Sequence, residues 1–305
     1  MKGIILAAGA STRLFPASLP ISKILLPVYD KPMIYYPLTT LMRAGIRDIM
    51  VITSPIDQDN FKRLLGDGSQ FGIKICYELQ KVPRGISDAF IIAEDFINGD
   101  DVCLILGDNL FYMDGLEDVL KKAIQENDGA TIFGYEVPDP DRFGVAGFDK
   151  KGNVTSLVEK PPKGTEESNY AVIGLYFYDG KICDIAKNLK PSDRGELEIT
   201  DANREYLEMD KIKICIPGKG FKWIDAGTFD SMLDASNTIR CIEDVTGKKV
   251  ASPEITAFDL GFIDKKGVED WVSKFKENDY FESVKKHCGI MTEKEKKKLL
   301  KKSSE

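Results

Sequence analysis

The start of this chain places small residues and two cations where a phosphorylated ligand could bind. An apolar run at residues 3–7 ends in a turn of small residues, namely Ala8, Gly9, Ala10, Ser11 and Thr12. Such a turn lets a ligand approach backbone N–H groups, which bind anions without any side chain. Arg13 and Lys23 add two positive charges nearby. The combination predicts a pocket for a polyphosphate.

Two common phosphate loops do not fit this segment. The P-loop requires G-x-x-x-x-G-K-[ST], and no Gly-Lys-Ser or Gly-Lys-Thr follows the turn. The dinucleotide fingerprint requires G-x-G-x-x-G, whereas this turn has Gly9 alone. The turn therefore indicates a different kind of nucleotide site.

Two aspartates follow apolar runs in distant parts of the chain. Asp108 follows residues 102–107, and Asp225 lies in Trp223-Ile224-Asp225-Ala226-Gly227. Mg²⁺ usually takes one or two carboxylates together with phosphate oxygens and water. The pair suits a metal–nucleotide site, although an Asp after a strand can equally cap the next helix.

Three further segments carry weaker signals. Glu159-Lys160-Pro161 could offer a carboxylate to sugar hydroxyls and a Lys to a phosphate, or form a surface ion pair. Arg194-Gly195 could bind a phosphate, while the following Glu196 and Glu198 could charge a helix N-terminus. The 80–85 loop contains Gln80, whose amide has the donor and acceptor that a pyrimidine edge needs, but it is also typical of an ordinary turn.

The elements that must position these residues alternate in the first half of the chain. Strand-like runs at 3–7, 49–53, 73–78, 102–106 and 130–135 are separated by helix-like segments at 33–44, 59–65, 86–96 and 116–125. This alternation predicts an α/β fold with a doubly wound, mostly parallel sheet and helices on both faces. Ligands of such sheets bind at the carboxyl ends of the strands, where the loops after 6 and 106 lie.

The second half has a different pattern. Residues 144–148 and 154–159 predict a β-hairpin insertion, 172–178 a strand, 198–208 a helix and 211–216 a strand. From 229 onward the chain is mainly helix-like. We expect a core at 1–235, a mainly helical C-terminal segment at 236–290 packed on the core, and a disordered Lys-rich tail at 291–305.

Composition excludes several classes of protein. The net charge of -7 argues against nucleic acid as a partner, and no apolar run is long enough for a membrane helix. A single histidine, His287, argues against histidine-based catalysis. The six cysteines are scattered without a C-x-x-C pair, which favours reduced thiols in a cytoplasmic protein.

The motifs together resemble the sugar nucleotidyltransferases, and most closely the members that make dTDP-glucose. The resemblance spans residues 1–265 and rests on L-A-x-G-x-x-T-R-L-x-P at 6–16, S-K-x-L-L-P at 22–27, the 29–38 segment, Leu106-Gly107-Asp108-Asn109, residues 168–179 and residues 194–201. It implies a Rossmann-like fold and transfer of a nucleotidyl group from dTTP to glucose 1-phosphate, with Mg²⁺ as cofactor. It also implies that the 1–235 core is a nucleotidyltransferase domain whose nucleotide-binding half is followed by a sugar-binding half. A homo-oligomer, either a tetramer or a dimer, is implied as well.

The resemblance assigns roles at matching positions. The implied catalytic residues are Arg13, Lys23 and Lys160, and the implied Mg²⁺ ligands are Asp108 and Asp225. The implied nucleotide contacts are Leu6, Ala8, Gly9, Ser11, Thr12, Gln80, Pro83, Gly85 and Asp108. The implied sugar-phosphate contacts are Gly144, Glu159, Lys160, Val172 and Arg194.

Two alternatives stay open at this stage. Relatives that use dTTP carry a base-contacting Gln after the lysine, where this chain has Ile24, so UTP or another hexose 1-phosphate remains an alternative substrate. A nucleotide-sugar-binding regulatory subunit without catalysis is the second alternative.

The family often has a separate regulatory nucleotide site. Met113, Asp114 and Asp259 depart from the usual pattern of that site and predict weak inhibition by dTDP-rhamnose.

Overall fold

The computed structural model describes residues 1–292 and 295, and within them it shows a mixed sheet of nine strands. The parallel part consists of β5 (Lys74–Leu79), β4 (Asp48–Thr53), β1 (Lys2–Ala7) and β6 (Val102–Leu106), in that order across the sheet. The connecting helices are α1 (Tyr35–Arg43), α2 (Gln58–Leu65), α3 (Asp88–Ile92), α4 (Glu94–Ile97) and α5 (Leu116–Gln125). The α/β prediction is confirmed, with the predicted 86–96 helix divided into α3 and α4 at Ala93.

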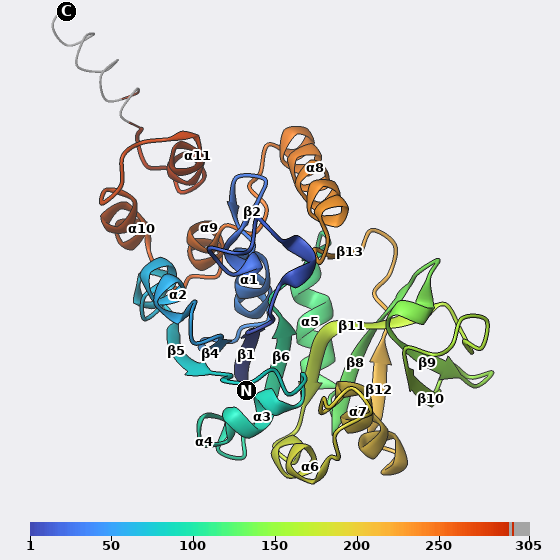
Figure 1. Cartoon of the computed structure of the whole chain (residues 1–305). Helices are drawn as coiled ribbons and strands as arrows, with labels where there is room; N and C mark the ends of the chain where they lie inside the picture. Colours follow the sequence, from blue (N-terminus) through green and yellow to red (C-terminus); the bar gives the residue numbers. More distant parts are fainter. Residues whose placement is uncertain (293–294, 296–305) are drawn as a thin grey trace, which may run out of the picture.

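The strands of the second half add an antiparallel part around β11 (Tyr170–Tyr178). β11 pairs with β6, with β8 (Ala130–Glu136) and with β9 (Gly144–Phe148), always antiparallel. β9 and β10 (Val154–Glu159) form the predicted hairpin, and β12 (Ile212–Cys215) lies parallel to β8. Helices α6 (Ile182–Asn188) and α7 (Ile199–Glu208) cover this part (Figure 1).

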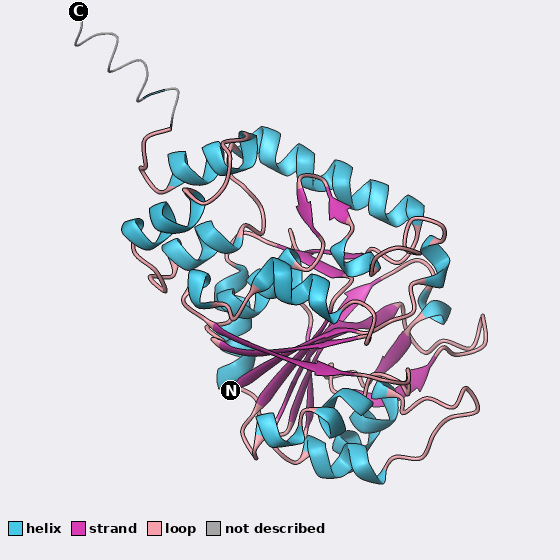
Figure 2. Cartoon of the chain, turned by 60° about the vertical axis from the view of Figure 1, so that its left-hand side comes forward, coloured by secondary structure: helices cyan, strands magenta, loops and turns pink. Residues whose placement is uncertain are grey.

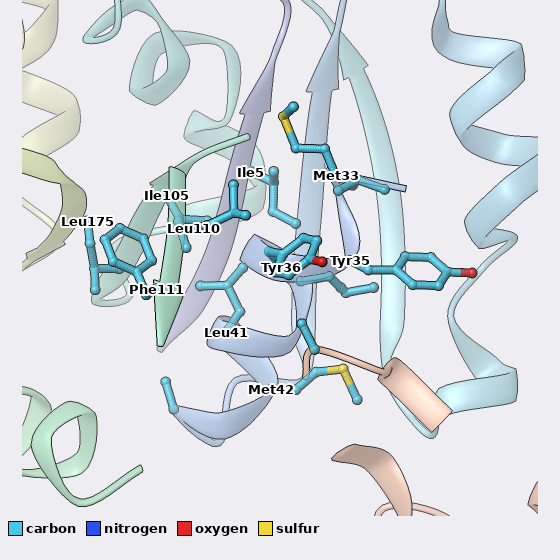
Figure 3. Close-up of a cluster of buried hydrophobic side chains, with 14 of the residues drawn as sticks. Ile5, Met33, Tyr35, Tyr36, Leu41, Met42, Ile105, Leu110, Phe111 and Leu175 are labelled. Atoms are coloured by element: carbon cyan, nitrogen blue, oxygen red, sulfur yellow. The ribbon is translucent and has the colours of Figure 1, made fainter. Parts of the chain in front are cut away.

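Helices lie on both faces of the sheet (Figure 2). Alternate residues of β1 enter different cores, since Ile5 packs in one hydrophobic cluster and Ile4 in the other, as the period of two along a strand requires. In the first cluster Ile5 and Ile105 lie beside Tyr36 and Leu41 of α1 (Figure 3). A sheet buried on both faces explains the continuous apolar runs of its parallel strands.

Two small ribbons complete the part of the fold that positions the site. β7 (Asn109–Tyr112) pairs antiparallel with β13 (Lys222–Asp225), and β2 (Pro27–Val28) with β3 (Lys31–Pro32). Short helical turns at Thr12–Leu14, Lys23–Leu25 and Pro140–Arg142 carry the cations Arg13, Lys23 and Arg142. None of these ribbons was predicted from the sequence, because each is too short to show a hydrophobic period.

The C-terminal segment is helical, as predicted from residue 229 onward. It consists of α8 (Phe229–Thr246), α9 (Pro253–Asp259), α10 (Lys265–Val272) and α11 (Asp279–His287). α9, α10 and α11 share a small core of their own around Val268 and Val284. Most of the predicted Lys-rich tail lies outside the described residues. Among the described helices, none is long and apolar enough to cross a membrane.

Candidate active site

A cavity of about 260 Å³ opens beyond the carboxyl end of β6, between the parallel and antiparallel parts of the sheet. It gathers residues that are far apart in the sequence. The predicted site residues that line it are Arg13, Asp108, Gly144, Glu159, Lys160, Val172, Arg194 and Asp225. Its position agrees with the rule that open α/β sheets bind ligands at the carboxyl ends of their strands.

The β7–β13 ribbon brings the two aspartates to one place. Asp225 lies opposite Asn109 in the strand register, and the N–H of Ala226 donates to the peptide oxygen of Asp108 at 3.0 Å. Asp108 and Asp225 therefore face the same cavity although 116 residues separate them in the sequence. This is the pairing that the sequence alone left undecided.

The two carboxylates differ in their electrostatic surroundings. Lys23 forms an ion pair with Asp108, whose side chain is 17% exposed. Burial alone would raise the pKa of Asp108, but the Lys23 ammonium outweighs it and keeps that pKa below its usual value. Burial and then the charge of Asp108 raise the pKa of Asp225 to about 6. Repulsion between two buried carboxylates is what a bound cation would relieve.

The Arg13 guanidinium reaches the same end of the cavity. A Cβ on Gly227 would lie 3.0 Å from Nη2 of Arg13 and 3.2 Å from Oδ1 of Asp225, so the absence of a side chain there leaves room for both. Arg13 belongs to the Thr12–Leu14 turn, which begins at Ser11 with a φ of 56° in the left-handed region. Arg13 is also one of the charges that favour ionised Asp225.

The predicted sugar contacts lie in one row across three neighbouring strands. Gly144 is opposite Glu159 in the β9–β10 pair and opposite Val172 in the β9–β11 pair. Thr200 Oγ1 donates to Oε2 of Glu159 at 2.6 Å, and a Cβ on Gly144 would approach that hydroxyl to 2.9 Å. Glycine at position 144 therefore leaves the space between the Glu159 carboxylate and Val172 open.

Two cations stand at the sugar end. Lys160 has a φ of 42°, and its Nζ lies 3.7 Å from Oε1 of Glu159. Arg194 donates to Glu198 and to Glu159, with distances of 2.7 Å to Oε2 of Glu198 and 3.2 Å to Oε1 of Glu159. Both side chains are 40–47% exposed and line the cavity, so they can reach an anionic ligand.

The segment expected to bind the base lies outside the cavity, and its Gln80 side chain is hydrogen-bonded within the protein. The side-chain amide of Gln80 donates to the peptide oxygen of Gly85 at 3.2 Å and to Oδ2 of Asp88 at 3.1 Å. With its N–H groups used in this way, Gln80 can offer a ligand its amide oxygen. Pro83 lies exposed in the same loop. Neither Gln80 nor Pro83 lines the 260 Å³ cavity.

The remaining predicted nucleotide contacts surround the first turn. Leu6 accepts a hydrogen bond from the Gly107 N–H at 2.9 Å through its peptide oxygen. Ala8 is buried, whereas Gly9 and Thr12 are exposed, and none of the three lines the 260 Å³ cavity. Ile24 is 3% exposed and packs against Gly107, where a Cβ would meet its Cγ2 at 3.1 Å. Ile24 therefore belongs to the core and not to the binding surface.

Asn109, Arg142 and Thr200 are among the cavity residues that were not predicted from the sequence. Asn109 is 3% exposed and bonds to Asp108, Gly174 and Trp223. Arg142 lines the cavity and contributes positive charge to Asp225, and Thr200 holds Glu159. Asn109 could have been suspected because it follows Asp108 directly. No sequence signal marks Arg142 or Thr200, whose roles depend on tertiary contacts.

Comparisons with known proteins agree with this fold. The model of the nucleotidyl transferase family matches residues 2–241, and the chain belongs to that family.

Within this family, the chain is similar to relatives that share one name. The chain is 52% identical over 279 residues to a glucose-1-phosphate thymidylyltransferase of Xanthomonas campestris pv. campestris, covering 92% of this chain and 94% of the relative. It is 52% identical over 264 residues to the protein of the same name from Mycolicibacterium smegmatis, covering 87% of this chain and 91% of that one.

Two solved structures are also similar to this chain in sequence and in fold. A Bacillus anthracis protein, provisionally named a glucose-1-phosphate thymidylyltransferase and solved with sucrose, is 39% identical with a TM-score of 0.73, over 79% of this chain and 95% of that one. A UDP-glucose pyrophosphorylase solved with UDP-glucose is 27% identical with a TM-score of 0.70, over 79% of this chain and 98% of that one.

Proposed function

We propose that this protein transfers a thymidylyl group from dTTP to α-D-glucose 1-phosphate, giving dTDP-glucose and pyrophosphate. The observation that carries the proposal is the composition of one cavity. Asp108, Asp225 and Arg13 line it, with Lys23 paired to Asp108 behind them. Lys160, Arg194 and Glu159 line it as well. The names and high identity of the relatives support dTTP and glucose 1-phosphate as the substrates.

The chemistry needs positioning and charge neutralisation more than proton transfer. A phosphate oxygen of the sugar phosphate is already ionised near neutral pH and attacks the α-phosphorus in line, so no general base is required. The single histidine, His287, pairs with Asp259 at 2.7 Å and does not line the cavity. Arg13 and Lys23 stabilise charge on the nucleotide phosphates, while Lys160 and Arg194 orient the sugar phosphate.

The residues present fit a magnesium ion. Within the described part of the chain there is no cluster of three or more His, Cys, Asp or Glu side chains able to hold a metal. Mg²⁺ does not need one, because it takes one or two carboxylates and completes its shell with phosphates and water. Asp108 and Asp225 would hold it, since both line the same cavity. When bound, Mg²⁺ neutralises charge on the phosphates.

Further roles belong to the same proposal. Leu6, Ala8, Gly9, Ser11 and Thr12 bind nucleotide through their backbone, and Gln80, Pro83 and Gly85 contact the base. Gly144, Glu159 and Val172 contact the sugar. We also propose a homo-oligomer, a tetramer or a dimer, and a cytoplasmic location, which six unpaired cysteines support. The division into a 1–235 core, a 236–290 helical segment and a 291–305 tail remains part of the proposal.

The test is pyrophosphate release from the purified protein with Mg²⁺ and glucose 1-phosphate, comparing dTTP with UTP. We expect turnover with dTTP that requires both substrates and the metal, and a loss of about 2–4 kcal/mol of transition-state stabilisation in Arg13→Ala, by analogy with other preorganised donors. Turnover with UTP alone would move the product to UDP-glucose. An absence of turnover with either nucleotide would contradict the proposal and favour a nucleotide-sugar-binding subunit.

A further inference from the structure

Two loops of the site, which are 105 or more residues apart in the sequence, are joined by their backbones. The N–H of Leu197 donates to the peptide oxygen of Arg84 at 2.7 Å, and the N–H of Ser87 donates to the peptide oxygen of Leu197 at 3.2 Å. One loop, residues 80–87, contains the proposed base contacts, and the other, residues 192–198, contains Arg194. Their outer residues are exposed, whereas Leu197 and Glu198 at the junction are buried.

The junction depends on a close approach that only glycine permits. Gly85 has a φ of 101°, and a Cβ there would lie 2.5 Å from the peptide oxygen and 2.6 Å from the nitrogen of Leu197. The peptide oxygen of Gly85 accepts from the side chain of Gln80 at 3.2 Å. The proposed base-reading side chain is therefore bonded to the residue that touches the second loop.

Glu198 is the residue through which the junction reaches the sugar-phosphate end. It is 7% exposed, and its peptide oxygen accepts from Ser87 Oγ at 3.0 Å. Its carboxylate accepts from Nε of Arg194 at 3.1 Å, from Nη2 at 2.7 Å and from Ser192 Oγ at 2.6 Å. The carboxylate thus holds the Arg194 guanidinium through two nitrogens, as a bidentate pair does.

The held guanidinium remains available to a ligand. The Arg194 side chain is 40% exposed, lines the cavity and reaches Glu159 of the proposed sugar contacts at 3.2 Å. Holding a long side chain in place before binding reduces the entropy lost when it captures an anion. A nucleoside that ordered the 80–87 loop would order the Arg194 loop as well, because the two share their backbone bonds.

We propose that Glu198 is a positioning residue that couples the two substrate sites: its main chain fixes the base loop, its carboxylate fixes Arg194, and nucleoside binding therefore strengthens sugar-phosphate binding. This inference rests on the proposed function for the identity of the two ligands. Coupling of this kind is reciprocal, so glucose 1-phosphate strengthens nucleoside binding by the same factor.

The test is calorimetric titration of the full chain with glucose 1-phosphate and Mg²⁺, with and without saturating thymidine, which has the base but no phosphate. In the wild type, thymidine should lower the dissociation constant of glucose 1-phosphate about fivefold or more, the range in which site coupling is usually measured. In Glu198→Gln that dissociation constant should rise about tenfold, as expected for loss of a charge-assisted bond, and the effect of thymidine should disappear.

Variants separate this role from a structural one. Ser192→Ala, which removes a single bond to the carboxylate, should show a smaller shift in the same direction if Glu198→Gln does not fold. Glu205→Gln, an exposed carboxylate on the same helix α7, should behave as the wild type. In an Arg194→Ala background, Glu198→Gln should cause no further loss of glucose 1-phosphate affinity, because its effect passes through Arg194.

The outcomes distinguish this inference from the proposed function. A wild-type protein that turns over dTTP and glucose 1-phosphate but shows no effect of thymidine would overturn the coupling. A full-sized effect of Glu198→Gln in the Arg194→Ala background would overturn the positioning role. A wild type that neither binds glucose 1-phosphate nor turns it over would instead contradict the proposed function.

Discussion

The side-chain nitrogen of Asn109 donates a hydrogen bond of 3.0 Å to Oδ1 of Asp108. The oxygen of the same amide accepts from the N–H of Gly174 at 3.1 Å and from Nε1 of Trp223 at 2.7 Å. One buried amide therefore ties the proposed metal ligand Asp108 to β11 and to β13, which carries Asp225. Interactions of this kind orient metal ligands and are costly to remove.

Replacing Asn109 with Asp tests this connection. Asn109→Asp retains an oxygen for Gly174 and Trp223 but turns the group facing Asp108 from a donor into a second carboxylate. We expect activity to fall about tenfold to a hundredfold, the cost of losing a hydrogen bond to a charged group, with more Mg²⁺ needed for half-maximal rate. Steady-state rates over a magnesium series measure both effects. Asn237→Asp, on the exposed face of α8, is the control. Equal rates in the Asn109 and Asn237 variants would show that the Asn109 amide does not contribute to activity.

Filling the space at Gly144 tests the sugar end of the cavity. A Cβ at this position would lie 2.9 Å from Thr200 Oγ1 and 3.3 Å from Oε2 of Glu159. Gly144→Ala should therefore displace the Glu159 carboxylate and raise the KM for glucose 1-phosphate, with about 1–3 kcal/mol lost to overpacking. The KM for dTTP should change little. Gly218→Ala, whose Cβ would meet nothing within 4 Å, is the matched control. An increase confined to the KM for dTTP would place the sugar elsewhere.

The burial of Ile24 leads to a prediction about substrate choice. Ile24 packs against Gly107 in the core, so it does not contact the base in this arrangement. Ile24→Gln should not improve the preference for dTTP over UTP. It should instead lower the free energy of unfolding by about 1–3 kcal/mol, because it buries an amide in an apolar site. Chemical denaturation and the ratio of kcat/KM for the two nucleotides measure the two effects. A clear gain in dTTP preference would show that the residue at position 24 does contact the base.

The parallel part of the fold could be predicted because its strands are buried on both faces. Val102 to Ile105 of β6 are all fully buried, and such a run is visible in the sequence as unbroken apolar residues. Residues 144–148 and 154–159 were predicted with the bounds that β9 and β10 have. In these segments the local pattern and the tertiary environment point to the same structure.

The arrangement of the site could not be predicted in the same way. Asp108 and Asp225 meet through the β7–β13 ribbon, whose four-residue strands have no period of their own. The buried Asn109 also bonds to Gly174 and Trp223, which are distant in sequence. Glu198 likewise accepts from the distant Ser87. Residue types show what chemistry is possible, whereas long-range pairing decides which of those residues share a cavity.

Asp30 offers a pH-dependent test of how the C-terminal segment is attached. Burial alone would raise the pKa of Asp30, but the ammonium groups of Lys31 and Lys249 outweigh it and hold that pKa below its usual value. A carboxyl with a lowered pKa in the folded state stabilises the protein above its unfolded pKa of about 3.9, and the stabilisation is lost as the pH falls through the folded value.

Asp30→Asn should therefore be less stable than the wild type at pH 7, with a difference that shrinks below about pH 4. Denaturation midpoints across a pH series measure the difference. Asp270→Asn, on the exposed side of α10, provides the comparison. A difference that grows as the pH falls would show that the neighbouring ammonium groups do not stabilise ionised Asp30.

A second cavity bears on regulation by nucleotide sugars. Met113, Asp114 and Asp259, which depart from the usual family pattern, line one cavity of about 440 Å³ together with His287. Two of these residues bring negative charge toward any bound diphosphate. Two of the cations on the same walls are already engaged, since Arg43 pairs with Glu117 and Lys249 with Asp30 and Glu243. Apart from the Lys248 ammonium, an anionic ligand therefore finds little uncompensated positive charge in the cavity.

We accordingly predict that dTDP-rhamnose inhibits the wild-type enzyme weakly. Asp259→Arg should strengthen the inhibition, because it removes the carboxylate that pairs with His287 at 2.7 Å and adds a guanidinium able to bind a diphosphate. Initial rates at fixed substrate and increasing dTDP-rhamnose measure both proteins, and Asp270→Asn serves as an unaffected control. Strong inhibition of the wild type would refute the prediction. Equally weak inhibition of the Asp259→Arg variant would show that the charge at position 259 does not determine how strongly dTDP-rhamnose inhibits.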